Sequence, residues 1–310
     1  MSEPPRNLDH DLLADRRRMK RRLSLWRGMA VLLALGGLFL LAGPRWMGGG
    51  VPGAGHVLRL SVEGTISDDR KLTEAIDAAS RDPLVRGMIL SIDSPGGSVA
   101  GGEGLHASLA RFRAEKPLAA VMRGTAASAG YMIAMPAERV FARESTLTGS
   151  IGVILQSFDV SELLATLGVQ AELLTSGPLK GVPSPFRPLE AQGRDALQRV
   201  VADMHAQFID MVAVGRDLPR DQVAQLADGR VYTGRQALEL KLVDAIGAEP
   251  EARAWLAASH QIPQTVPVRD LDPRGAAERW LGVSVRAVVK TVISEWLAID
   301  GARAVWQLPR

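Results

Sequence analysis

The chain has 310 residues, of which 46% are hydrophobic and 23% are charged, a composition typical of a folded protein with a well-buried core. It contains no cysteine, which excludes disulfides, zinc-thiolate sites, a cysteine nucleophile and a lipoprotein anchor. The formal net charge of +3 does not indicate nucleic-acid binding, because the basic excess is concentrated between residues 16 and 27, beside an apolar run that favours membrane phospholipid as the partner.

The N-terminal region predicts a membrane anchor. Residues 1–24 form a polar, basic tail, and the uncharged run GMAVLLALGGLFLLA follows between Trp26 and Trp46. Counted between the tryptophans, the run approaches the ~20 residues that cross a bilayer, so we assign residues 25–47 to a transmembrane helix. The excess of cations before it predicts a cytoplasmic N-terminus, with the rest of the chain outside the inner membrane of a bacterial cell. The alternative is a cleaved signal peptide, but LAGPRW is a poor match to an A-x-A-like cleavage site.

A glycine-rich linker at 48–55 separates this anchor from an α/β domain at 56–259. From His56 onward, apolar strand patterns alternate with helical patterns, as a βα-alternating core requires. The expected strands are 57–63, 86–93, 117–123, 139–142, 150–156 and 169–175, and the expected helices are 69–80, 98–113, 127–135, 159–167, 188–214, 220–227, 234–241 and 249–259.

Residues 260–310 are assigned to a C-terminal tail. Between Gly275 and Leu297, apolar residues recur at helical spacing with arginine and lysine among them, which predicts an amphipathic helix. Such a helix packs on the core or on a partner subunit, or it contacts a membrane surface.

Two consecutive βα units end in turns that could carry chemistry. Strand 86–93 runs into DSPGGSV, and strand 117–123 runs into GTAASAGYMIA, which places Ser128 at the start of a helix. Backbone N–H groups at such turns can hold an anion or a developing oxyanion. Proline and glycine also serve steric needs there, and a serine can be an N-cap or a small packing residue. Because sites form at the carboxyl ends of parallel strands, we expect Ser128 and the glycines to lie close together.

A nucleophilic serine needs a base, and no histidine is well placed along the chain to provide one. His10 lies in the basic tail, His56 next to the linker, His260 at the end of a helix, and His106 and His205 inside helical patterns. The remaining option is lysine, although an ordinary lysine is neutral in only about one molecule in 2,500 at pH 7. Burial without a counter-ion can remove that difficulty.

Lys180 stands among apolar residues in SGPLKGVPSPF, with its nearest acids in the sequence at Glu172 and Glu190. It is the candidate base, and the alternative is an exposed loop lysine. Ser150, in TLTGSIGV, opens another predicted strand and could orient a neutral lysine by a hydrogen bond, or it could be an ordinary turn residue.

These motifs resemble those of signal peptide peptidase A of the short, single-domain bacterial type. The resemblance covers roughly residues 56–250, and the segments that carry it are DSPGGSV, GTAASAGYMIA, LTGSIGV, SGPLKGVPSPFRPL and GRVYTGRQALELKLVD. It implies a Clp/crotonase-like core of repeated ββα units followed by C-terminal helices. It also implies a serine endopeptidase that cleaves remnant signal peptides and other unfolded hydrophobic peptides.

The resemblance also implies the roles of individual residues. Ser128 would be the nucleophile, Lys180 the general base and Ser150 the residue that orients the lysine. The oxyanion would be held by the backbone N–H of Ala129 together with that of Gly96 or Gly97. No metal and no cofactor would be needed. The family forms a homo-oligomer in which the serine of one subunit meets the lysine of a neighbour.

Three other interpretations remain open on the sequence. A crotonase-like acyl-CoA enzyme would share the fold and the pair of N–H groups, but it would need neither the serine nor the lysine. A non-catalytic membrane scaffold would keep the fold for oligomerisation alone. A Clp-like protease would use a Ser/His/Asp triad, with His106 as the residue to replace.

Overall fold

The computed structural model describes Trp26, Met29 and residues 55–271. A separate compact unit begins at Gly55. Apart from Trp26 and Met29, the predicted anchor at 25–47 lies outside the described residues, as does the predicted amphipathic helix at 275–297. None of the helices in the described part of the chain is long and apolar enough to cross a bilayer.

A single mixed sheet forms the centre of this unit. Its described strands are β1 (His56–Ile66), β2 (Val85–Gly97), β3 (Leu118–Ala127), β4 (Arg139–Ala142), β5 (Leu147–Gly149), β6 (Val231–Thr233), β7 (Ala245–Ile246) and β8 (Val268–Asp270). They follow the order β6-β5-β3-β2-β1-β8, with β4 beside β3 and β7 beside β4. Among the described strands, β5 and β6 pair in antiparallel orientation, and every other pair of neighbouring strands is parallel. The carboxyl ends of β2, β3 and β5 therefore meet at one edge.

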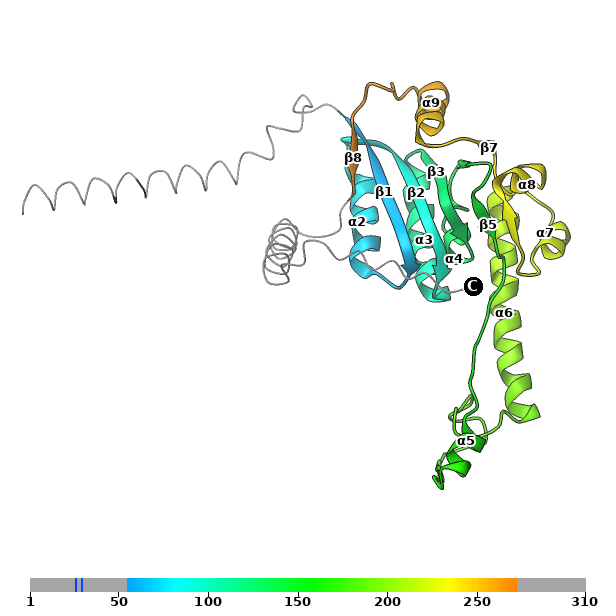
Figure 1. The fold of residues 1–310 in the computed structure, drawn as a ribbon. Coiled ribbons are helices and arrows are strands. Elements are labelled where there is room, and N and C mark those ends of the chain that lie inside the picture. The colour runs from blue at the N-terminus through cyan, green and yellow to red at the C-terminus, as the bar shows by residue number, and fades with distance from the viewer. Residues whose placement is uncertain (1–25, 27–28, 30–54, 272–310) are drawn as a thin grey trace, which may run out of the picture. The chain divides into compact units, whose positions relative to one another are not determined.

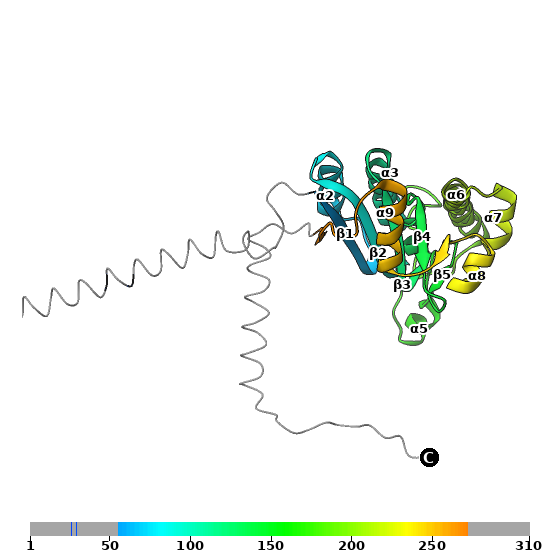
Figure 2. The same cartoon turned by 90° about the horizontal axis from the view of Figure 1, so that it is seen from above.

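Helices cover both faces of the sheet. The described helices are α2 (Arg70–Arg81), α3 (Val99–Glu115), α4 (Ala129–Met132), α5 (Ser161–Thr166), α6 (Ala191–Arg216), α7 (Arg220–Leu226), α8 (Gly234–Glu239) and α9 (Glu249–His260), and of these α5 lies away from the sheet (Figure 1). Residues from α2, α3, α4 and α6 share the larger hydrophobic core with alternate residues of β1, β2 and β3. The intervening strand residues, such as Val57 and Ile89, point to the other face of the sheet and form a smaller core with α9. Figure 2 shows α6, α7 and α8 gathered at the end of the sheet beyond β5.

Local sequence explains where the central elements begin. Residues 88–90 and 92 of β2 are completely buried, as expected for a parallel strand covered on both faces. The carboxylate of Asp69 accepts a hydrogen bond from the N–H of Leu72 and caps α2, and the hydroxyl of Ser98 accepts one from Gly101 and caps α3.

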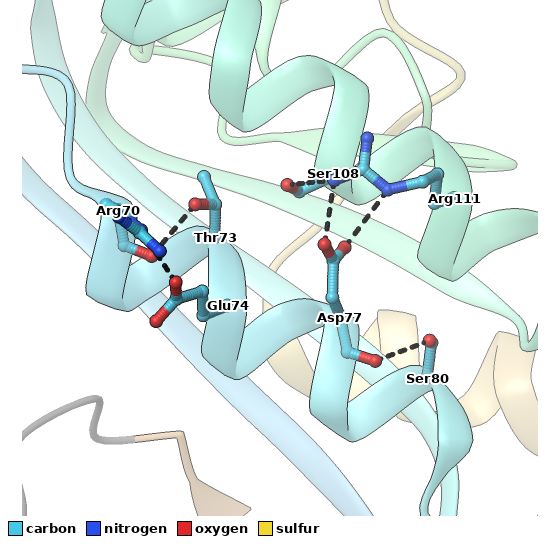
Figure 3. A network of polar contacts seen from close by, with 7 residues as sticks. All are labelled: Arg70, Thr73, Glu74, Asp77, Ser80, Ser108 and Arg111. Atoms are coloured by element: carbon cyan, nitrogen blue, oxygen red, sulfur yellow. Dashed lines mark hydrogen bonds and ion pairs between the residues drawn. The ribbon is translucent and has the colours of Figure 1, made fainter.

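Polar contacts also hold α2 and α3 together. The guanidinium of Arg111 donates to both oxygens of Asp77, at 3.2 and 2.9 Å, and to the hydroxyl of Ser108 at 2.9 Å (Figure 3). The contact joins the second half of α2 to the second half of α3.

The segment between β5 and α6 differs from the sequence-based prediction. The predicted strands at 150–156 and 169–175 are wrong, because the structure contains no strand in either range. The whole segment extends away from the sheet beside α6, where no neighbouring strand is available for pairing (Figure 1). A sequence with strand propensity needs a hydrogen-bonded neighbour to form a ladder, and residues 55–271 provide none for this stretch. We call residues 150–190 the arm.

Two further differences concern short elements. The predicted helix at 127–135 is shorter, because α4 covers only Ala129–Met132 and is followed by turns. The short strands β6, β7 and β8 were not expected. β8 lies in the segment that the sequence assigned to the tail, yet it pairs with β1 and so extends the sheet.

Candidate active site

Ser128 occupies a strained turn between β3 and α4. Its backbone has φ 53° and ψ −123°, a conformation that costs on the order of 1–3 kcal/mol for a residue with a side chain. The turn is held by a hydrogen bond from its N–H to the carbonyl of Gly149 (2.9 Å) and by two that its carbonyl accepts from Tyr131 and Met132 (both 2.9 Å). Although Ser128 stands at the N-cap position, its hydroxyl makes no capping bond. The N-cap alternative is therefore wrong, and the hydroxyl is left for another use.

The Pro-Gly-Gly turn after β2 lies directly against this serine. A β-carbon built on Gly96 would stand 3.2 Å from Oγ of Ser128 and 2.8 Å from its Cβ, and the second distance is shorter than real β-carbons show. The structure thus brings together the two turns that the sequence predicted at one edge of the sheet.

The N–H groups of the two glycines in that turn differ in their hydrogen bonding. The N–H of Gly96 donates to the hydroxyl of Ser94 at 3.1 Å, and Ser94 is completely buried. Ile66 pairs with Gly97 in the parallel ladder, and its carbonyl accepts from Ser98 at 2.9 Å. Because successive N–H groups of a strand point to opposite sides, the N–H of Gly97 points away from β1, toward β3. The N–H of Ala129 is at the first position of α4, where a helix leaves its N–H groups without an intrahelical partner.

Ser150 begins the turn next to that of Ser128. Ala127 and Gly149 are paired in the β3–β5 ladder, so the two serines each follow a paired position on strands about 4.8 Å apart. Ser150 also has a positive φ, of 50°, and its N–H donates to the carbonyl of Arg230 at 2.8 Å.

Lys180 lies in the arm, away from these two turns. The loop that carries it packs on the beginning of α6, since a β-carbon on Gly193 would stand 2.8 Å from Cγ1 of Val182. The other end of α6 packs on the region after the serine turn, because a β-carbon built on Gly215 would lie 2.7 Å from Cβ of Met135. At 1.5 Å per residue, the helix between Gly193 and Gly215 spans about 33 Å. The Lys180 side chain is exposed, so one chain by itself brings the two serines together but not the lysine.

The arm exposes many large apolar side chains. Ile154 is 90% exposed and Leu174 is 89% exposed. Others on the arm that remain exposed are Leu155, Phe158, Leu163, Leu167, Val169, Leu173, Leu179 and Phe186. An exposed apolar surface of this extent on a folded protein indicates an interaction site.

Histidine does not take the place of the lysine in the described part of the chain. No hydrogen bond joins the Ser128 hydroxyl to His56, His106, His205 or His260, the histidines that the structure describes. His106 lies within α3, where burial lowers its pKa.

Sequence reasoning missed a buried polar network behind α4. The hydroxyl of Tyr131, which is completely buried, donates to the carbonyl of Leu242 at 2.8 Å. Close by in the chain, Asp244 accepts two hydrogen bonds from the guanidinium of Arg216, at 2.9 and 2.7 Å, and one from the N–H of Val140 at 2.7 Å. The network ties the four-residue helix after Ser128 to the C-terminal end of α6. The bonded pairs are 111 and 28 residues apart, so no local pattern could have indicated them.

Comparison with known proteins gives consistent matches. Residues 110–262 match Peptidase family S49, a range that includes Ser128, Ser150 and Lys180. A protein of Synechocystis sp. that is named as a protease is 37% identical over 202 residues, covering 65% of this chain and 73% of the relative. A protein of Enterococcus faecium that is named as the signal peptide peptidase SppA is 33% identical over 241 residues, covering 73% of this chain and 70% of the relative.

Among solved structures, the membrane-bound stomatin-specific protease 1510-N, determined as an alanine mutant, aligns with a TM-score of 0.49 and 13% identity. The alignment covers 71% of this chain and 99% of that structure.

Proposed function

The chain belongs to peptidase family S49 and is a serine peptidase of the signal peptide peptidase A type, and on that premise we propose that it is a membrane-anchored endopeptidase with a Ser/Lys dyad. Its substrates are remnant signal peptides and other unfolded hydrophobic peptides. The observation that carries the choice of nucleophile is the turn at Ser128. Strain in that backbone and an uncommitted hydroxyl are features that cluster at active sites.

The proposed chemistry is acyl transfer through a covalent intermediate. The hydroxyl oxygen of Ser128 attacks the peptide carbonyl while the neutral amine of Lys180 takes its proton. The ammonium then gives that proton to the leaving amine, and an acyl-serine remains. A water molecule, deprotonated by the same lysine, hydrolyses this ester and restores the serine.

Two backbone N–H groups stabilise the oxyanion in this proposal. One is that of Ala129, at the start of α4. The other is that of Gly97 rather than Gly96, because the N–H of Gly96 is already bonded to Ser94. Donors of this kind contribute about 10²–10³ each in kcat.

The lysine comes from a second copy of the chain. This step is supported by the exposure of Lys180, by the length of α6 between its loop and the serine turn, and by the apolar arm. Contact with a neighbouring subunit would bury the arm and remove water from the amine, which favours its neutral form. Ser150, in the turn beside Ser128, then orients the incoming amine.

The proposal includes the location and the architecture. A single span at 25–47 holds the domain on the outer side of the bacterial inner membrane, so the lipid bilayer is a partner of the protein. The sheet with its flanking helices is the Clp/crotonase-like core.

Casein and signal-peptide cleavage by the full chain in detergent tests this function. We expect Ser128→Ala, Lys180→Ala and Lys180→Arg all to abolish cleavage, because arginine keeps the charge but cannot give up its proton. Lys241→Arg, in the turn after α8, is the matched control and should cleave at the wild-type rate. Full activity in Lys180→Arg would exclude the lysine as base.

A further inference from the structure

A cavity lies on the sheet face that carries α9. Its volume is about 800 Å³, and its lining includes Arg59, Ser61, Ser91, Val121, Arg123 and Arg143. Residues 248–250, at the start of α9, form one side of it. None of the residues proposed above for catalysis lines the cavity, so the proposed peptidase function leaves it unexplained.

The register of the sheet places the polar residues in rows. Ser61 pairs with Ser91, and Ser91 pairs with Val121, which sets the two hydroxyls on neighbouring strands. Beyond the last pair of β3 and β4, Met122 with Ala142, come Arg123 and Arg143. Like charges at such opposed positions are destabilising unless something between them is negative.

Three arginines and three carboxylates line the cavity, and one of the arginines lacks an ion pair in the described part of the chain. Arg59 forms ion pairs with Asp270 at 2.6 Å and with Glu249 at 3.3 Å, so both of these carboxylates already have a cationic partner. Asp69, the remaining acid of the lining, accepts the capping hydrogen bond of α2. Arg143, in contrast, has no ion-pair partner among the residues that the structure describes.

A further arginine and the hydroxyl of Ser91 also line this space. Arg123 forms an ion pair with Glu63, on the side away from Arg143. Ser91 is only 8% exposed, and its hydroxyl makes no hydrogen bond to another described residue. The oxygen of this hydroxyl is not among the buried polar atoms that lack a partner, so it is open to the cavity and free to hydrogen-bond to a ligand.

We propose that this cavity binds a phosphate ester, with Arg143 and Arg123 donating to the phosphate oxygens and the hydroxyls of Ser91 and Ser61 completing its hydrogen bonds. Arginine presents a planar set of donors that matches phosphate oxygens, and such charge-assisted bonds are the strong ones. The cavity is larger than a phosphate alone, so it has room for the alcohol part of the ester. That ester is either a soluble molecule or the headgroup of an anionic lipid.

Binding of glycerol 3-phosphate to the full chain in detergent, measured by calorimetry at low salt, tests the site. We expect saturable binding that weakens at least tenfold in Arg143→Gln and in Arg123→Gln. Arg194→Gln, an exposed position on α6 outside the cavity, is the matched control and should stay within twofold of wild type. Arg143→Lys keeps the charge and should retain intermediate affinity, which separates loss of the site from loss of the fold.

A second measurement distinguishes the two sources of the ester. In nanodiscs, phosphatidylglycerol raises the melting temperature above that in phosphatidylcholine if the headgroup occupies the cavity, and Arg143→Gln removes the increase. Binding of glycerol 3-phosphate without that increase identifies a soluble ester. Absence of both effects, or equal losses in Arg194→Gln, would overturn the proposal. Casein cleavage should be unchanged in Arg143→Gln, so failure here is distinct from failure of the peptidase function.

Discussion

Gly96 and Ser128 are in such close contact that the glycine cannot carry a side chain: its β-carbon would lie 2.8 Å from that of the serine, and its φ is 117°. We therefore expect Gly96→Ala to lower the cleavage rate about 100-fold or more, because the shift that relieves the overlap misplaces the nucleophile against an oxyanion donor. The measurements are casein cleavage and the rate of Ser128 labelling by a fluorophosphonate.

Gly104→Ala is the matched control for that substitution. Gly104 lies inside α3, and the nearest heavy atom to its added β-carbon is 3.9 Å away. Alanine favours a helix over glycine by roughly 1 kcal/mol, so this variant should be slightly more stable and equally active. Wild-type labelling of Gly96→Ala would show that the contact does not control the nucleophile.

The distance between the serine turn and the lysine loop predicts complementation between inactive subunits. Ser128→Ala and Lys180→Ala should each be inactive alone. Mixed under conditions of subunit exchange, they should recover part of the activity, because some interfaces then join an intact serine to an intact lysine. Cleavage assays on mixtures give the result, and mixed oligomers are confirmed with two affinity tags. Mixed oligomers without activity would rule out a shared site.

The sequence predicted the part of the molecule that depends on local patterns. The buried strand β2, the helix after Ser98 and the meeting of Gly96 with Ser128 all follow from apolar runs, turn residues and the geometry of parallel strands. The predicted strands of the arm failed because ladder pairing depends on a neighbour, which a propensity pattern cannot supply.

The polar network behind α4 marks the other limit of sequence reasoning. Tyr131 and Leu242 meet only because the chain folds back after α6, and Arg216 reaches Asp244 for the same reason. Single polar residues in helices and turns give no sign of such partners. The hydrogen bonds that hold α4, directly after Ser128, could therefore be found only in the structure.

The apolar arm predicts that assembly depends on its exposed leucines. Leu174 is 89% exposed in the single chain, so Leu174→Asp should not disturb the fold of one subunit. If a neighbour buries this side chain, the added charge would weaken the interface and shift the protein toward monomers. Light scattering after chromatography reports the mass, and the cleavage rate should fall in parallel.

Val214→Asp provides the matched control for the arm variant. Val214 is 84% exposed but lies near the C-terminal end of α6, outside the arm. It should leave the mass and the activity unchanged. An unaltered mass in Leu174→Asp would show that the arm does not form the interface.

The Arg216–Asp244 pair predicts how stability depends on pH. Burial by itself raises the pKa of the Asp244 carboxyl, but hydrogen bonds from Arg216 and its charge outweigh burial and hold the pKa below its ordinary value. A carboxyl with a lowered pKa in the folded state stabilises the fold above its unfolded pKa, about 3.9, and loses this contribution as the pH falls through the folded pKa. Asp244→Asn removes that charge and leaves the guanidinium of Arg216, whose side chain is only 6% exposed, without a counter-ion.

At pH 7 we expect Asp244→Asn to lower the free energy of unfolding by about 3–5 kcal/mol, the usual cost of breaking a buried ion pair. The difference from wild type should begin to shrink below about pH 4, because the carboxyl of the unfolded wild-type chain then takes up a proton, and it should shrink further as the pH falls through the folded pKa. Urea unfolding at pH 7 and pH 3.5 measures both values. Asp210→Asn, which breaks the exposed pair with Arg220, is the control and should change the free energy by no more than about 1 kcal/mol. A pH-independent difference for Asp244→Asn would mean that the ionised carboxylate does not stabilise this fold.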